Sequence, residues 1–325
     1  MFHKPAFFVA GVVLALSSGI PVGAADGVKI TEQSDRLVID INGKPFTEYR
    51  FTGAPHVYFY PLLGPGGTPM TRDFPMKDVP GEEQDHKHHR SLWFSHGAVN
   101  GVDFWSEEAK AGKIVHDKFF EVKSGDKAGL IRSANRWIAP DGDVVCTDER
   151  TFRVLATPDN ERVFDFEITI TAPPGKDVIF GDTKEGSMGI RVAETMRLKP
   201  NKQNAGKPVG QIVQSTGVKD DKTWGKRAGW CDYSGPVGGK ILGVAIFDNP
   251  SNPRYPTWWH VRDYGLFAAN PFGQHDFEKK PTGAGDLTIP AGKRVTFKYR
   301  IYLHEGDEQQ AGVAERFEKY VAGQK

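Results

Sequence analysis

A cluster of histidines in one short segment is the feature of this chain with the clearest chemical potential. Four of the ten histidines lie between His86 and His96, next to an aspartate, a lysine, an arginine and a tryptophan. Histidine has the side-chain pKa nearest neutrality and is also the commonest metal ligand. The segment therefore predicts proton transfer, a metal site or an anion pocket, and all three alternatives stay open here.

The spacing of the first three histidines separates their roles. On an extended strand, His86 and His88 point to one face and His89 points to the other. Two imidazoles on one face are half of a metal site, which Asp85 or a distant carboxylate would complete. We therefore expect a divalent metal at His86 and His88 as one alternative, although the neighbouring lysine and arginine weigh against a tightly bound cation. The other alternative is a surface loop.

A second segment, residues 182–191, is a charged, glycine-containing loop that leads into an apolar strand. Glu185 follows Lys184 at the mouth of this strand and is placed to act as a general base, while Arg191 lies within the strand. The pKa of such a glutamate depends on its burial and on the nearby positive charge. The alternative for this segment is a solvated turn.

A third segment, residues 248–265, combines three prolines with two adjacent tryptophans. The prolines favour an ordered, extended loop. Trp258 and Trp259 cannot share one side of a strand, so we expect one to pack inward and the other to line a cleft. Aromatic rings beside hydrogen-bonding groups suit a polyhydroxylated ring. The hydrogen-bonding groups are His260, Arg262 and Asn270, and Trp105 is either core or a further stacking platform.

The N-terminal residues 1–25 have the features of a signal peptide. Lys4 precedes an unbroken run of apolar residues and glycine over 6–16, and small residues follow at 22–24. The run is shorter than the roughly 20 residues that a membrane-spanning helix needs. We therefore expect an exported protein, periplasmic or secreted, with residues 26–325 forming one domain.

The remaining chain is predicted to be built of strands. Residues 36–41 alternate and are followed by Asn42-Gly43, a hairpin signal, and residues 163–171 and 295–304 also alternate. Further apolar or β-branched runs lie at 113–122, 128–138, 143–155, 188–198, 210–216 and 241–247. Only 307–321 has a helical pattern, with Asp307 as its expected N-cap. The fold class predicted is all-β: a large antiparallel β-sandwich with a C-terminal helix.

Charge and cysteine content exclude some classes of function. Lysine and arginine together number 42 and aspartate and glutamate 41, so no long-range field favours nucleic acid. No segment after the signal peptide is apolar enough to span a membrane. Cys146 and Cys231 are expected to be two buried thiols or one structural bridge rather than a disulfide scaffold.

These motifs together resemble a bacterial family labelled methane oxygenase PmoA, otherwise a domain of unknown function. The motifs that carry the resemblance span most of the mature chain: residues 86–97, residues 183–186 with 189–191, and residues 256–265. Lys87 departs from the proline expected between the two histidines. The mature chain lacks the several apolar spans of a membrane monooxygenase subunit, and cleavage after Ala24 would not expose an N-terminal histidine for a copper site. The architecture resembles the galactose-mutarotase-like supersandwich, whose members epimerise, cleave or bind sugars.

The hypothesis that follows is an exported carbohydrate-active protein, an epimerase or lyase working by general acid–base chemistry. Its alternatives are a non-catalytic sugar-binding protein and a histidine-coordinated metal-dependent enzyme. No cofactor beyond that metal is expected, and the expected partner is a small-molecule or glycan substrate. The expected catalytic residues are His86, His96, Glu185 and His260, and the expected substrate-binding residues are Arg90, Trp105, Lys184, Arg191, Trp259, Arg262 and Asn270.

Overall fold

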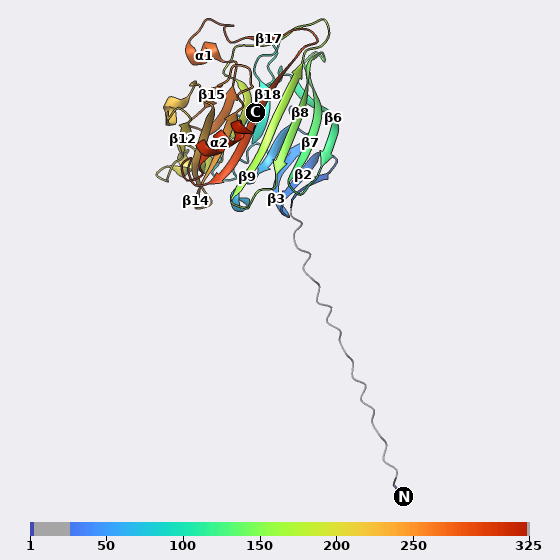
Figure 1. Ribbon diagram of the computed structural model, residues 1–325, viewed down its shortest axis with the longest axis vertical. Helices are drawn as coiled ribbons and strands as arrows, with labels where there is room; N and C mark the ends of the chain where they lie inside the picture. The colour runs from blue at the N-terminus through green and yellow to red at the C-terminus, as the bar shows by residue number, and fades with distance from the viewer. Residues whose placement is uncertain (3–26, 324–325) are drawn as a thin grey trace.

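The protein is described by a computed structural model, which places residues 1–2 and 27–323 (Figure 1). Residues 3–25 of the predicted signal peptide lie outside the described residues. Within the described ranges, no helix is long and apolar enough to cross a membrane.

The first of two large sheets carries the segments singled out for chemistry. It has eight antiparallel strands. In spatial order these are β1 (Val28–Glu32), β2 (Arg36–Ile41), β3 (Lys44–Arg50), β4 (Tyr58–Leu62), β5 (Leu92–His96), β11 (Gly186–Arg191), β16 (Leu266–Asn270) and β15 (Trp258–Val261).

The second sheet also has eight antiparallel strands, and its longer strands form the front of the view in Figure 1. In spatial order these are β12 (Gln211–Gln214), β13 (Trp230–Val237), β14 (Lys240–Asp248), β18 (Arg294–Glu305), β9 (Glu161–Thr171), β8 (Val144–Leu155), β7 (Ala128–Ile138) and β6 (Lys113–Lys123).

Short elements complete the fold. A two-stranded sheet pairs β10 (Val178–Phe180) with β17 (Leu287–Ile289). The helices are α1 (Gln274–Glu278) and α2 (Val313–Ala322), and the 3-10 turns are η1 (Pro65–Gly67), η2 (Glu194–Met196), η3 (Lys202–Asn204) and η4 (Asp220–Thr223).

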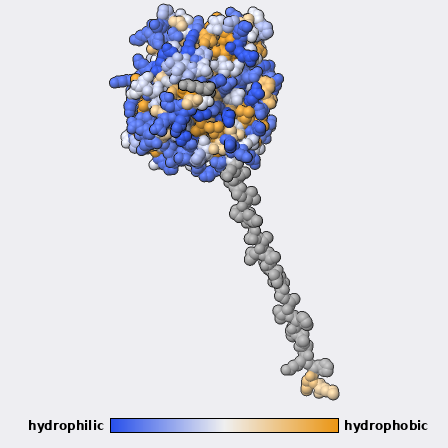
Figure 2. Space-filling model, viewed as in Figure 1, coloured by the Kyte–Doolittle hydropathy of each residue, from blue (hydrophilic) through white to orange (hydrophobic). Residues whose placement is uncertain are grey.

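The two large sheets share one hydrophobic cluster. Strand residues from both contribute to it, because alternate side chains of each strand point inward. In the second sheet Ile168 and Ile170 of β9 pair across to β18 and are fully buried. On the face shown in Figure 2, hydrophilic residues predominate and hydrophobic ones form small separate patches. The apolar residues of the chain thus mainly fill the space between the sheets.

The strand predictions are confirmed in most places. Strand β7 has the predicted bounds, and β2, β6, β8, β9, β14 and β18 differ from theirs by at most two residues. The Asn42-Gly43 turn is also confirmed, with positive φ at both residues. The all-β sandwich with a C-terminal helix is therefore confirmed. The run at 188–198 is only partly strand, since β11 ends at Arg191 and η2 follows.

The helix prediction was wrong at its start. α2 begins at Val313, and its N-cap is Gly312. Asp307 instead accepts hydrogen bonds from the backbone N–H groups of Gln309 and Gln310, so it stabilises the turn before the helix. The five-residue helix α1 was not predicted, because it is too short to show a helical period.

A buried polar network joins the two sheets. The Asp148 carboxylate of β8 accepts hydrogen bonds from Asn135 Nδ2 (2.6 Å), Trp137 Nε1 (2.7 Å) and the Arg150 guanidinium (3.0 and 3.1 Å). Arg150 Nη2 also donates to the backbone carbonyl of Phe94 in β5 of the first sheet. Asp148 and Arg150 are 1% and 2% exposed, so each neutralises a charge that water does not reach.

We therefore predict that Asp148→Ala lowers the free energy of unfolding by about 3–5 kcal/mol, because it leaves the Arg150 charge buried without a partner. Urea unfolding followed by tryptophan fluorescence measures the change. Asp126→Asn, at an exposed position before β7, is the control and should change stability by less than about 0.5 kcal/mol. A similarly small loss in Asp148→Ala would contradict the prediction.

Candidate functional site

The outer face of the first sheet forms the floor of a cavity. Strand pairing places one row of residues side by side on this face: His260 of β15, Ala268 of β16, Gly189 of β11, Trp93 of β5 and Tyr58 of β4. The two central residues are small, and a Cβ on Gly189 would lie 2.8 Å from the Trp93 ring. The Trp93 ring therefore covers the sheet at Gly189, and of this row only His260 lines the cavity.

The histidine segment forms one wall as a turn and not as a strand. β5 begins only at Leu92, and residues 85–91 fold back on themselves, with φ of 42° at His86 and 57° at Ser91. The prediction that His86 and His88 share one strand face, opposite to His89, was therefore wrong. The rings of all three lie close together, and His86 stacks on His89 at 4.8 Å between centroids.

An ion pair between a buried arginine and a partly exposed aspartate attaches this turn to the sheet. Arg191 of β11 is fully buried, and its Nη2 donates to Asp85 Oδ1 at 2.9 Å. The Arg72 guanidinium donates to the same carboxylate and to the backbone carbonyls of Asp85 and His86. Burial opposes ionisation of Asp85, but the hydrogen bond from His86 and the charges of the two arginines hold its pKa well below its usual value.

The Arg191 contact also determines which nitrogen of His89 carries the proton. Arg191 Nη1 lies 3.0 Å from His89 Nδ1, and a guanidinium can only donate. His89 Nδ1 is therefore an acceptor. Burial holds the pKa of His89 well below 6.5, so the ring is neutral at pH 7. In the neutral ring the proton is then on Nε2, which makes His89 a fixed donor.

His260 has the opposite arrangement. Its Nδ1 lies 2.6 Å from the backbone carbonyl of Lys184, which can only accept, so Nδ1 carries the proton. Its Nε2 then carries a lone pair and no proton, and this atom is buried without a hydrogen-bond partner among the described residues. Burial lowers the pKa of His260 to about 3. The ring is a neutral, fixed acceptor.

The loop before β11 forms the opposite wall and is held from below. Asn270 Nδ2 donates to the backbone carbonyls of Thr183 and Lys184, at 3.0 and 2.9 Å. The side chains of Lys184 and Glu185 form an ion pair of 3.1 Å and are each more than one-third exposed. Asn270 is fully buried and is not among the residues that line the cavity, so its observed contacts are with the loop.

Together these segments enclose a cavity of about 430 Å³, which we call the histidine cavity. Of the predicted site residues it brings together His86, His260, Glu185, Lys184, Trp105 and Arg262, and also His88. The remaining lining residues, which the sequence did not mark as catalytic or binding, are His89, Gly97, Asp103, Ser106 and Tyr264.

Several predicted site residues lie outside this cavity. His96 is fully buried between Phe180 and Phe272, with Nε2 2.8 Å from the Gly181 carbonyl. Trp259 is fully buried in the core and donates to the Ala228 carbonyl. Trp258 is 2% exposed, and neither tryptophan of the pair lines the histidine cavity.

Most of the arginines predicted to bind substrate are already bound to other side chains of the protein. Arg90 forms a two-bond ion pair with Glu107, at 2.5 and 2.8 Å. Arg191 is held by Asp85 and His89 as described above. Arg262 is the exception: its guanidinium lies over the rings of Trp224 and Tyr264 and has no carboxylate within 4.0 Å in the described part of the chain.

The two histidines predicted as metal ligands have their ring centroids 5.7 Å apart. His86 Nδ1 is bound to Asp85 Oδ2 at 2.8 Å. Over residues 1–2 and 27–323, no group of three or more His, Cys, Asp or Glu side chains is arranged to hold a metal ion. The metal site therefore stays a prediction. Cys146 and Cys231 are both buried and free.

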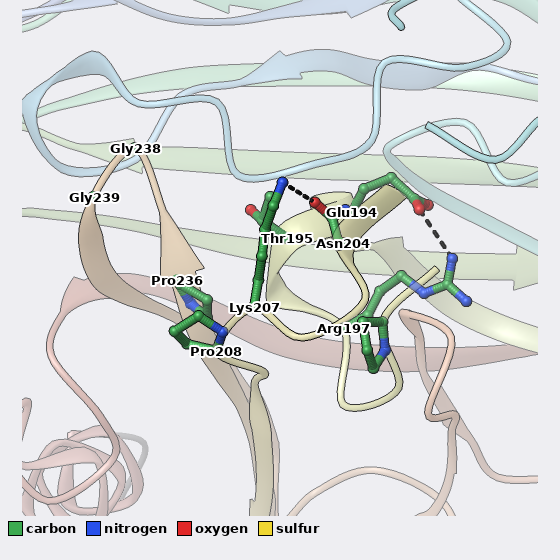
Figure 3. A pocket seen from close by; sticks show the side chains of 10 residues that line it. Glu194, Thr195, Arg197, Asn204, Lys207, Pro208, Pro236, Gly238 and Gly239 are labelled. Carbon is green, nitrogen blue, oxygen red and sulfur yellow. Dashed lines mark hydrogen bonds and ion pairs between the residues drawn. The ribbon is translucent and has the colours of Figure 1, made fainter. Parts of the chain in front are cut away.

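A separate cavity of about 170 Å³ lies beside η2 and contains none of the predicted catalytic residues (Figure 3). Its polar groups are paired with one another: Arg197 with Glu194 at 2.9 Å, and Lys207 with Asn204 at 3.0 Å. Its other lining residues include three prolines and two glycines. The histidine cavity, which has unpaired donors and acceptors, is the better site for chemistry.

Comparison with known proteins identifies a family. The model of DUF6807, a family of unknown function, matches residues 36–318. No curated protein sequence matches the chain. The label methane oxygenase PmoA is not confirmed by these comparisons.

Among solved structures, the chain is similar to a heparan sulfate lyase HepC mutant from Pedobacter heparinus, with 9% identity, a TM-score of 0.41 and coverage of 88% of this chain and 36% of that one. It is also similar to a glycoside hydrolase family 97 enzyme in complex with acarbose from Pseudoalteromonas sp. strain K8, with 12% identity, a TM-score of 0.32 and coverage of 86% of this chain and 34% of that one. A third similar structure is the GalM/aldose epimerase homologue from C. elegans, with 7% identity, a TM-score of 0.32 and coverage of 87% of this chain and 99% of that one. The chain thus spans about a third of the length of the first two.

The buried histidines predict how stability depends on pH. Burial lowers the pKa of His96 to about 4, against 6.5 for an exposed ring. Between these values the unfolded chain binds a proton that the folded chain does not, so the free energy of unfolding decreases as pH falls from about 6.5 to about 4. Each pKa unit corresponds to about 1.4 kcal/mol, so His96 alone contributes up to roughly 3 kcal/mol of this loss.

Urea unfolding at pH 7, 6, 5 and 4 tests this for the wild type and for His96→Gln, which cannot titrate. We expect a shallower pH dependence in the variant. Asp248, whose pKa burial raises to about 7, opposes the trend in both proteins and cancels in the comparison. Equal slopes would contradict the prediction.

Proposed function

The chain belongs to the DUF6807 family, whose function is unknown, and we propose from its histidine cavity that it is a carbohydrate-active enzyme using general acid–base chemistry. The observation that carries the proposal is the opposite proton placement on two neutral imidazoles, His89 as donor and His260 as acceptor. Two groups whose surroundings give them complementary roles are typical of an acid–base pair.

His260 is proposed as the base. Its proton is held on Nδ1 by the Lys184 carbonyl, so its free Nε2 accepts a proton from the substrate. The hydrogen bond at Nδ1 also stabilises the imidazolium that this transfer forms. Glu185 is the second acceptor in the cavity, with its carboxylate beside the Lys184 ammonium.

The donors are proposed to stabilise oxygen atoms of the substrate. His89 presents its Nε2–H, and Arg262 and Lys184 provide positive charge. When a proton leaves the substrate, negative charge develops on a neighbouring oxygen, and oriented donors lower the energy of that charge. The reaction classes compatible with this arrangement are epimerisation and elimination.

A sugar is the proposed substrate because the cavity lining is rich in hydrogen-bonding groups. Asp103, Ser106, Glu185 and Tyr264 add acceptors and hydroxyls to the imidazoles and cations. The volume of about 430 Å³ lies within the range of about 300–1,000 Å³ typical of small-molecule sites.

Export to the periplasm or the medium is part of the proposal. It rests on the sequence of residues 1–25.

We predict that His260→Gln and His89→Gln each lower kcat by roughly 10²–10⁴, the usual contribution of a positioned acid or base. The assay is a panel of neutral and oxidised mono- and disaccharides, followed by NMR for epimer exchange and by ultraviolet absorbance for unsaturated products.

The matched control is His275→Gln. His275 is exposed on α1, lines no part of the cavity, and makes a similar contact from Nδ1 to a backbone carbonyl, that of Lys280 at 2.8 Å. Its replacement should leave turnover within about twofold of wild type, since surface changes have small effects. If both cavity variants also retain wild-type turnover on every sugar that the protein converts, the acid–base assignment is wrong.

A further inference from the structure

A second cavity lies directly beside the histidine cavity and shares one residue with it. It has a volume of about 340 Å³ and is lined by Ile212, Asp220, Asp221, Trp224, Val261, Arg262 and Asp263. Arg262 also lines the histidine cavity. We call this second space the Trp224 pocket.

Arg262 forms the boundary between the two cavities. Its guanidinium carbon is 6.0 Å from the centre of the Trp224 ring on one side and 5.4 Å from the centre of the Tyr264 ring on the other. Its guanidinium has no protein hydrogen-bond acceptor or ion-pair partner within the described residues. Its donors are therefore free for a ligand that passes from one cavity into the other.

The Trp224 ring is held in place by its surroundings. Gly225 N–H donates to the Trp259 carbonyl of β15 at 2.9 Å, and the preceding turn η4 is bound to β12 through Gln214 Nε2 and the Thr223 carbonyl. The ring contacts Phe277 and His260 edge-on, at 5.3 and 6.4 Å between centroids. The indole is half-buried, so its orientation is fixed while part of it faces the pocket.

Apart from Arg262, the charged side chains of the pocket are carboxylates. Asp220 Oδ1 is occupied by the backbone N–H of Ile212. The Asp221 and Asp263 carboxylates have no ion-pair partner within 4.0 Å in the described part of the chain. An aromatic face and free carboxylates suit a ring that stacks by its C–H face and donates from its hydroxyls.

We propose that the Trp224 pocket is a second sugar subsite, and that the substrate is a glycoside of at least two units with Arg262 at the junction between them. The proposal rests on the proposed function, because the first unit would occupy the histidine cavity. It adds that the number of sugar units in the substrate determines specificity, and that Trp224 and Asp221 contact the second unit.

The test compares matched monosaccharides and disaccharides, such as glucose with maltose and cellobiose and galactose with lactose. For wild type, Trp224→Ala, Trp224→Phe and Asp221→Ala, the ratio of kcat/KM for disaccharide to that for monosaccharide is measured. We expect this ratio to fall by roughly tenfold in Trp224→Ala, to recover in Trp224→Phe, and to fall by roughly threefold in Asp221→Ala, the equivalent of one weakened contact each.

Using a ratio removes any general effect of Trp224→Ala on folding or on His260, and Asp221 is exposed, so its replacement does not depend on repacking. Asp126→Ala is the control and should leave the ratio at the wild-type value. An unchanged ratio in Trp224→Ala and Asp221→Ala, with monosaccharide turnover retained, overturns the second subsite and leaves the proposed function standing. If no sugar of either length is converted by wild type, both proposals are wrong.

Discussion

The histidine cavity depends on one interaction, the ion pair between the buried Arg191 and the partly exposed Asp85. Arg191 lies on a central strand and is fully buried, and burial lowers its pKa to about 10, so it stays charged and needs a partner. Asp85 supplies the charge and thereby holds the histidine turn against the sheet. Because the same guanidinium also donates to His89, one interaction both places the turn and sets the proton on that ring.

In the opposite wall, one backbone carbonyl is shared by two residues of the sheet. The Lys184 carbonyl accepts from both His260 and Asn270, which stand on neighbouring strands of the floor. The loop therefore cannot shift without disturbing His260. Lys184 orients this proposed base through its backbone carbonyl and forms the exposed ion pair with Glu185 through its side chain. Between the two walls, Gly189 makes room for the Trp93 ring, since a Cβ at this position would lie 2.8 Å from it.

Much of the fold was predictable because a strand has a sequence pattern that is visible within a few residues. Alternation of apolar and polar residues predicted the long strands, and Asn42-Gly43 predicted the hairpin turn that follows residues 36–41. Which histidine reaches the cavity was not predictable in the same way. His96 and His260 are both strand histidines with similar neighbours, but the pairing register directs His260 to the outer face, while His96 is enclosed by Phe180 and Phe272. Likewise, His89 was expected to face away from His86, because a turn with positive φ cannot be distinguished from a strand by histidine spacing alone.

Burial gives the cavity neutral imidazoles but weakens them as bases in its empty form. A pKa of about 3 keeps His260 unprotonated at any pH above that value, yet it also makes proton transfer to its Nε2 unfavourable. A bound substrate changes this balance. A hydroxyl that donates to Nε2, and negative charge that develops nearby as the proton leaves, both favour the imidazolium and raise its pKa. The base thus becomes effective only when a polar ligand fills the cavity, which is why the surrounding donors and the catalytic imidazole are best understood as one unit.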